Sequence, residues 1–162
     1  MNLPSSLAAA LIAALACTCA YADDTVTINV SGTLTRGPCT LTSSKTLTAN
    51  FGSLRTDEIN TASTIDIPVK LSCPANSALN VSIKASGTYQ SSNILATTSK
   101  VGLVYQLSWN SDNTSANLTG TKRSLTNQSG TIDLSLKAKL IAMETQTAGA
   151  FTGSSVITLE YL

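Results

Sequence analysis

Short runs in which apolar and polar residues alternate follow one another along most of the chain. The clearest covers residues 132–140, where Ile, Leu and Ala occupy the even positions and Asp, Ser and Lys the odd ones. Similar runs cover residues 26–34, 47–51, 65–73, 79–85, 101–109 and 157–161. Alternation with a period of two places one set of side chains on one face of a β-strand. No run has the 3.6-residue period of an amphipathic helix, so the pattern predicts an all-β protein.

Turn-rich segments such as residues 110–113 and 127–130 separate the runs. Six or seven short, one-sided strands with turns between them predict a single immunoglobulin-like β-sandwich. Pro68 interrupts the run 65–73, and since proline donates no ladder hydrogen bond we expect it at a sheet edge or a bulge. The 162 residues show no internal repeat and no low-complexity linker, and they favour one domain.

The first 22 residues have the pattern of an export signal. Residues 7–20 are almost wholly apolar, and this run of about 14 residues is shorter than a membrane-spanning helix needs. It ends in Ala20-Tyr21-Ala22, the small-x-small pattern of a signal-peptidase site. We therefore predict cleavage after Ala22 and an exported chain. The basic residue usual near the start of such signals is missing, and a lipoprotein acylated on Cys17 is the alternative interpretation.

Composition excludes several classes of function. The net charge is +1, from 10 basic and 9 acidic residues, which gives no electrostatic footprint for nucleic acid. The chain has no histidine, so Ser-His-Asp and Cys-His catalysis and His-ligated zinc are excluded. We see no set of acid, base and nucleophile that would indicate an enzyme. The sequence thus predicts no catalytic site, no metal, no cofactor and no small-molecule substrate.

Four cysteines divide into two pairs. Cys17 and Cys19 leave with the predicted signal, and the exported chain keeps Cys39 and Cys73. Two cysteines in a domain of an oxidising compartment predict one disulfide.

The two terminal runs are unusual in position. The run 26–34 stands between the cleavage site and the Gly37-Pro38 breaker, and the last run reaches the final residue. An apolar strand without a polar tail exposes an edge that needs a partner. The two runs pair with each other in a closed sandwich, or each pairs with another molecule; the pattern leaves both alternatives open.

Four features follow one another along the chain: the alternating run 26–34, Pro38-Cys39, Cys73-Pro74, and Gly149 with a penultimate Tyr161. Together they resemble the pilin subunits of the chaperone–usher pathway, in particular the type 1 fimbrial group. The alternating N-terminal run resembles the donor strand of such subunits. Pro38-Cys39 matches the entry into their first strand, and Cys73-Pro74 matches the second half of their disulfide. Gly149, fourteenth from the end, with a penultimate Tyr161 resembles their C-terminal signature. The donor-strand positions are Val26, Ile28, Val30, Gly32 and Leu34, and the C-terminal positions are Gly149, Ile157, Leu159, Tyr161 and Leu162.

The resemblance implies an immunoglobulin-like sandwich that lacks its last strand and is completed by a donor strand from another subunit. Residues 1–22 would then be the signal peptide, 23–36 the donor-strand extension and 37–162 the incomplete pilin domain. The implied partners are a periplasmic pilus chaperone, an outer-membrane usher and neighbouring pilin subunits. Such a subunit travels through the periplasm to a fimbrium on the cell surface and supports bacterial adhesion.

Two questions remain open at the level of the sequence. A major shaft subunit and a minor adaptor subunit both fit the resemblance. A stand-alone exported immunoglobulin-like binding module, or a lipoprotein, is the alternative to a pilus subunit.

Overall fold

The computed structural model of the chain describes residues 25–35, 37–90 and 92–162. The predicted signal peptide and Cys17 lie outside the described residues. The chain divides into two units, one that ends at Leu34 and one that covers Thr35–Leu162.

The described part of the first unit, residues 25–34, forms neither helix nor strand. Its large apolar side chains are almost fully exposed, at 84% for Val26, 81% for Ile28, 92% for Val30 and 102% for Leu34. Aliphatic side chains gain free energy when they leave water. The apolar side chains of this run are therefore still available for burial against another apolar surface.

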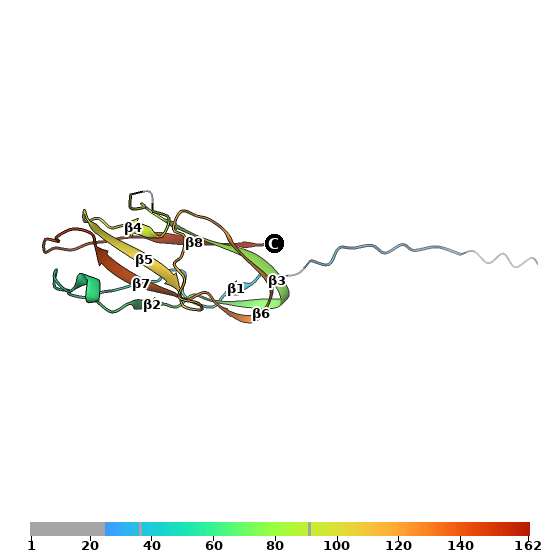
Figure 1. Cartoon of the computed structure of the whole chain (residues 1–162). Helices are drawn as coiled ribbons and strands as arrows, with labels where there is room; N and C mark the ends of the chain where they lie inside the picture. Colours follow the sequence, from blue (N-terminus) through green and yellow to red (C-terminus); the bar gives the residue numbers. More distant parts are fainter. Residues whose placement is uncertain (1–24, 36, 91) are drawn as a thin grey trace, which may run out of the picture. The chain divides into compact units, whose positions relative to one another are not determined.

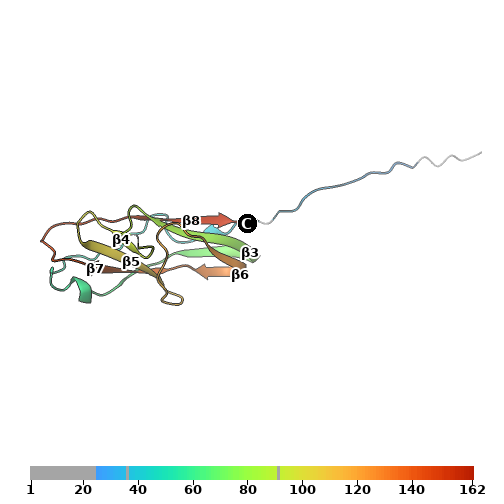
Figure 2. The same ribbon diagram turned by 45° about the horizontal axis from the view of Figure 1, so that its top comes forward.

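In the described part of the second unit, the strands form two four-stranded antiparallel sheets (Figures 1 and 2). The first sheet contains β1 (Thr40–Leu41), β3 (Lys70–Ala85) and β6 (Arg123–Asp133), with β8 (Ser155–Tyr161) also paired to β3. The second has the order β2 (Ile65–Ile67), β7 (Leu136–Ala142), β5 (Leu103–Trp109) and β4 (Leu95–Thr97). One short 3₁₀ helix, η1 (Ile59–Thr61), precedes β2. The all-β architecture predicted from the sequence is confirmed.

Two of the predicted strands cross from one sheet to the other and are each divided in two. Pro68 and Val69 separate β2 from β3, and Leu134 and Ser135 separate β6 from β7. The two crossings lie side by side, because the Leu134 amide donates to the Val69 carbonyl at 2.8 Å and the Val69 amide donates to Ser135 Oγ at 3.3 Å. At both crossings, apolar side chains continue to point inward at alternate positions although the hydrogen-bonded ladder is interrupted. For this reason the sequence predicts a single strand in each place.

The predicted turn at residues 127–130 is wrong, because these residues lie inside β6. Asn127 and Gly130 adopt positive φ values of 55° and 71°, and Asn76 opposite them in β3 has a φ of 58°. The ladder between β3 and β6 shifts register at this place. Asn and Gly tolerate the left-handed conformation that such bulges require. The Asn and Gly residues that suggest a turn in the sequence instead form a bulge in the ladder between β3 and β6. The strand β3 continues past this bulge without interruption, from Lys70 to Ala85.

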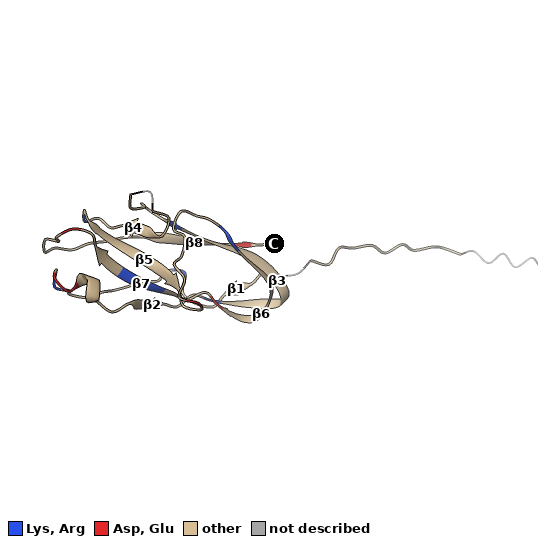
Figure 3. Ribbon diagram, viewed as in Figure 1, with Lys and Arg blue, Asp and Glu red and all other residues tan. Residues whose placement is uncertain are grey.

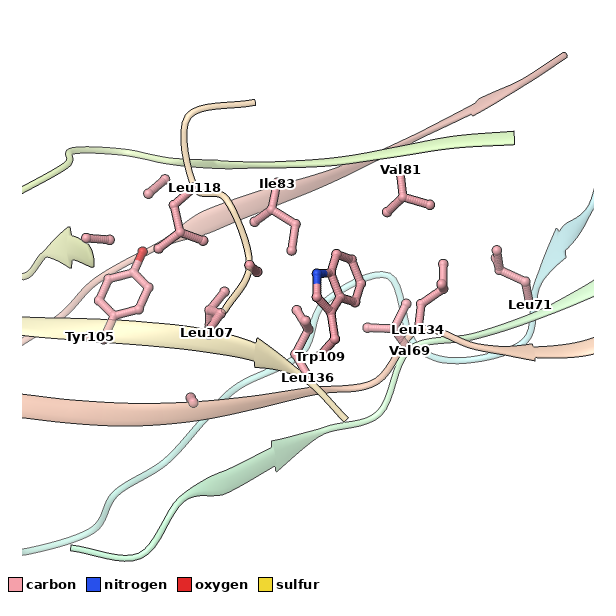
Figure 4. Packing of buried hydrophobic residues seen from close by; sticks show 14 of the residues in the cluster. Val69, Leu71, Val81, Ile83, Tyr105, Leu107, Trp109, Leu118, Leu134 and Leu136 are labelled. Carbon is pink, nitrogen blue, oxygen red and sulfur yellow. The ribbon is translucent and has the colours of Figure 1, made fainter. Parts of the chain in front are cut away.

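The core fills the space between the two sheets (Figure 4). Leu71, Val81 and Ile83 come from β3, and Leu107 and Leu136 face them from the other sheet; all are at most 5% exposed. Figure 3 shows the charged residues of this unit on loops and on strands such as β7, and none of those that the structure describes is buried. Burial of alternate residues from both sheets is what makes the alternating pattern visible in the sequence.

Candidate functional site

A long groove of about 1280 Å³ opens along one side of the sandwich. One wall is formed by residues 45–57 and the other by residues 146–155 and Ile157 at the start of β8. The floor consists of inward side chains of β5 and β7, namely Leu103, Tyr105, Leu107, Leu136, Ala138 and Leu140. These floor residues are core residues, and each is at most 9% exposed. The groove therefore gives access to the interior of the sandwich between the two sheets.

The β8 wall carries an open sheet edge. All seven residues of β8 pair with β3, from Ser155 opposite Ala85 to Tyr161 opposite Leu79. Within the described part of the chain, β8 has no second ladder partner. An unpartnered edge presents N–H and C=O groups that another strand can bind.

The opposite wall is held mainly by apolar packing. Leu47, Ala49, Phe51 and Leu54 are partly buried and pack against the core, and the alternate residues Thr48 and Asn50 are exposed. The alternating run 47–51 of the sequence forms no strand in the described structure. A segment with inward apolar side chains and no strand partner leaves room for one more strand between itself and β8.

The C-terminal positions singled out from the sequence fall at two places. Gly149 and Ile157 line the groove, and Gly149 has a φ of 138°, a conformation that L side chains rarely adopt. Leu159 packs against the core further along β8, while Tyr161 and Leu162 are 40% and 73% exposed. The structure thus brings the first two to the groove and leaves the last three beyond its lining residues.

The charges near the groove sit at its rim. Arg55 donates to Asp57 at 2.7 Å, and this hydrogen bond lowers the pKa of the Asp57 carboxyl. Lys100 Nζ donates to the carbonyl oxygens of Thr147 at 2.6 Å and Ala148 at 3.4 Å. Among the described residues, no group of three or more His, Cys, Asp or Glu could hold a metal ion. An apolar floor with charges only at the rim suits an apolar strand rather than a charged ligand.

Cys39 and Cys73 form a disulfide, as the cysteine count predicts. The bond joins the residue before β1 to β3, and both side chains are buried, at 4% and 6% exposure. It fixes the start of the segment that continues into the 45–57 wall.

Sequence reasoning missed Tyr105 and Gly153, which both line the groove. A Cβ built on Gly153 would lie 2.7 Å from Cε1 of Tyr105, so the ring and the glycine backbone are in close contact. The one available indication was that Tyr105 is a hydroxyl-bearing residue at an inward position of the apolar run 101–109.

A sequence comparison with known protein families identifies one that matches most of the chain. The sequence model of the family described as "Fimbrial protein" matches residues 28–162. Among curated proteins, a sequence search finds no match.

Solved structures of pilus proteins share the fold. The P pilus rod subunit PapA has 16% sequence identity and a TM-score of 0.64, covering 78% of this chain and all of that one. A subunit of a chaperone–usher pilus has 15% identity and a TM-score of 0.62, covering 87% of this chain and 98% of that one. A tip adhesin from Pseudomonas aeruginosa has 17% identity and a TM-score of 0.52, covering 60% of this chain and 30% of that one. The fold is thus the immunoglobulin-like sandwich of pilins, with one strand position open, and the chain belongs to the fimbrial protein family.

Proposed function

We propose that the chain is a structural, non-enzymatic subunit of a surface pilus and that it polymerises by donor-strand exchange. In this proposal the groove beside β8 accepts the N-terminal run of a neighbouring subunit, and the run 26–34 of this chain enters the groove of the next one. The observation that carries the proposal is the open groove itself, with core side chains as its floor and an unpartnered β8 edge in the described structure.

The donor run and the groove are complementary in chemistry. Val26, Ile28, Val30 and Leu34 are 81–102% exposed, and the groove offers an apolar floor. Burial of four aliphatic side chains contributes about 6–12 kcal/mol. Each new backbone hydrogen bond to the β8 edge adds about 1 kcal/mol net. Addition of a strand to a sheet edge is an established mode of recognition, of which chaperone–pilin complexes are an example.

Gly32 has a distinct role in this proposal. Apart from its two neighbours in the chain, no described residue has a heavy atom within 4 Å of a Cβ placed at Gly32, so the described structure does not require a glycine there. A glycine in an otherwise apolar alternating strand fits a place where another backbone approaches closely. The partner groove would supply that backbone.

Three kinds of partner follow from the proposal. A periplasmic pilus chaperone would cover the groove before assembly by lending a strand beside β8, with Ile157, Leu159 and Tyr161 near it and the Leu162 carboxylate as an anchor. An outer-membrane usher would then bring two subunits together, and neighbouring pilins would complete the sandwich. The assembled fimbrium on the cell surface would support adhesion.

The test is the state of association of the exported chain without its predicted signal. We expect the purified chain to form a ladder of non-covalent multimers in analytical ultracentrifugation. A variant with Ile28→Asp and Val30→Asp should stay monomeric, because two carboxylates cannot enter an apolar groove without a large desolvation penalty. A matched control, Thr27→Asp and Asn29→Asp, changes the other face of the same run and should retain multimers. Equal association of all three proteins would refute the proposal, and a stable monomer in every case would favour the stand-alone binding module.

A further inference from the structure

Tyr105 reaches across the floor of the groove to the other sheet. It lies in β5, where it pairs with Leu140 of β7, and its ring is buried among the core residues (Figure 4). Its hydroxyl lies 2.8 Å from the Ser154 carbonyl oxygen and 2.7 Å from Ser155 Oγ. A carbonyl only accepts, so the tyrosine proton goes to Ser154 and the Ser155 hydroxyl donates to the tyrosine oxygen. The one hydroxyl thus makes two hydrogen bonds, one to Ser154 just before β8 and one to Ser155, the first residue of β8.

The contact depends on the absence of a side chain at position 153. A Cβ there would lie 2.7 Å from Cε1 and 3.2 Å from Cδ1 of Tyr105, distances shorter than van der Waals contact. Gly153 is therefore required for space. Its lack of a side chain lets the ring lie against the backbone that leads into β8.

The Ser154 carbonyl joins both sheets. Besides the Tyr105 hydroxyl, it accepts from the Ser86 amide at 3.0 Å and from Ser86 Oγ at 3.2 Å. Ser86 follows the end of β3 in the first sheet, and Tyr105 belongs to the second. Burial raises the pKa of the Tyr105 hydroxyl, so its proton stays in place at neutral pH.

We infer that Tyr105 is a positioning residue for strand acceptance: its hydroxyl holds the start of β8 relative to the groove floor and so keeps the groove at the width that an incoming strand needs. This inference rests on the proposed donor-strand function. Gly153 and Ser155 are parts of the same contact. The wall of residues 146–155 is then fixed by polar contacts, since Lys100 also binds Thr147 and Ala148.

Loss of the contact should lower the fraction of molecules whose groove is ready to accept a strand. The apparent affinity of a ligand falls in proportion to that fraction. Once a strand is bound, its own ladder to β8 holds the wall, so the rate of strand dissociation should change little. The expected signature is a slower association rate with an unchanged dissociation rate.

The test measures binding of a fluorescent peptide of residues 24–35. The acceptor is the exported chain with Ile28→Asp and Val30→Asp, so that its own N-terminal run does not compete. Tyr105→Phe in this acceptor should lower the association rate about fivefold, which corresponds to about 1 kcal/mol. Ser155→Ala should slow association to a smaller extent, and the double variant should be no slower than Tyr105→Phe alone, because Tyr105→Phe already removes the hydrogen bond that Ser155→Ala removes.

Tyr89→Phe is the matched control, because the Tyr89 side chain forms no hydrogen bond with any described residue and does not line the groove. It should leave both rates unchanged. Hydrogen exchange provides a second readout: amides of residues 154–157 should exchange faster in the peptide-free Tyr105→Phe acceptor than in the Tyr89→Phe acceptor.

The possible failures are distinguishable. If the peptide binds the Tyr105→Phe and parent acceptors at rates within twofold of each other, or if Tyr89→Phe causes the same loss, the role of Tyr105 is refuted while strand acceptance stands. If the parent acceptor does not bind the peptide, the proposed function fails and this inference fails with it.

Discussion

Removal of the Cys39–Cys73 disulfide should lower the free energy of unfolding by an amount that depends on how far apart the two cysteines are in the sequence. The two cysteines are 34 residues apart. Closure of a loop of that length in the unfolded chain corresponds to about 4 kcal/mol of stability. Domains of ordinary size have a free energy of unfolding of about 5–15 kcal/mol, so the loss would be a large share of the total. The variant is Cys39→Ala with Cys73→Ala, which leaves no free thiol in the exported chain.

Urea unfolding followed by the fluorescence of the single tryptophan, Trp109, is the assay. Trp109 is 7% exposed and lies between the sheets, so its emission should change on unfolding. With a slope of about 2 kcal/mol per molar urea, a loss of about 4 kcal/mol lowers the midpoint by roughly 2 M. Reductant should lower the midpoint of the parent protein similarly and leave that of the double variant unchanged. A midpoint shift of less than about 0.5 M would refute the view that this disulfide stabilises the protein by lowering the conformational entropy of the unfolded chain.

Three further predictions concern the core, the crossing between sheets and the donor run. Leu136→Ala should lower the free energy of unfolding by about 2–5 kcal/mol, because Leu136 is 1% exposed, whereas Val156→Ala at a position 65% exposed should change it by less than about 0.5 kcal/mol; chemical denaturation compares the two. The pKa of Asp133 is lowered, chiefly by its hydrogen bonds from Ser135, so the stability that Asp133 contributes is present above the unfolded-state pKa near 3.8 and is lost as the pH falls through the folded-state pKa. Asp133→Asn should therefore make the melting temperature less sensitive to pH between about 5 and 2, and an identical pH profile would contradict this. Gly32→Val should leave the melting temperature of the monomer unchanged and reduce multimer formation in ultracentrifugation, and unimpaired assembly would count against a close backbone approach at this position.

The alternating pattern predicts the strand content because burial on one face of each strand selects it. Ile132 to Leu140 illustrates both the success and its limit. The apolar side chains all point inward, yet the chain changes sheets at Leu134 and Ser135. The alternation of apolar and polar residues shows which face of a strand is turned to the core. It does not show which neighbouring strand pairs with it through backbone hydrogen bonds.

The groove was predictable only in part. An open edge at the last strand followed from its position and from the family resemblance. The floor residues, by contrast, look like ordinary core positions in the sequence, because the same side chains fill a closed sandwich and an open one. Tyr105 and Gly153 are 48 positions apart, and their contact depends on how the two sheets face each other, which no local pattern encodes.

The central claim is that the sandwich lacks one strand and that residues 24–35 can supply it. The most direct measurement compares the thermal unfolding of two exported chains that both carry Ile28→Asp and Val30→Asp in their own N-terminal run, each with residues 24–35 appended after Leu162 through a flexible linker. In one the appended strand is unchanged; in the other it carries Asp at the positions of Ile28 and Val30. The account predicts that the first protein is a monomer that melts cooperatively and well above the second. Equal melting temperatures would contradict it, because they would show that the groove gains nothing from this strand.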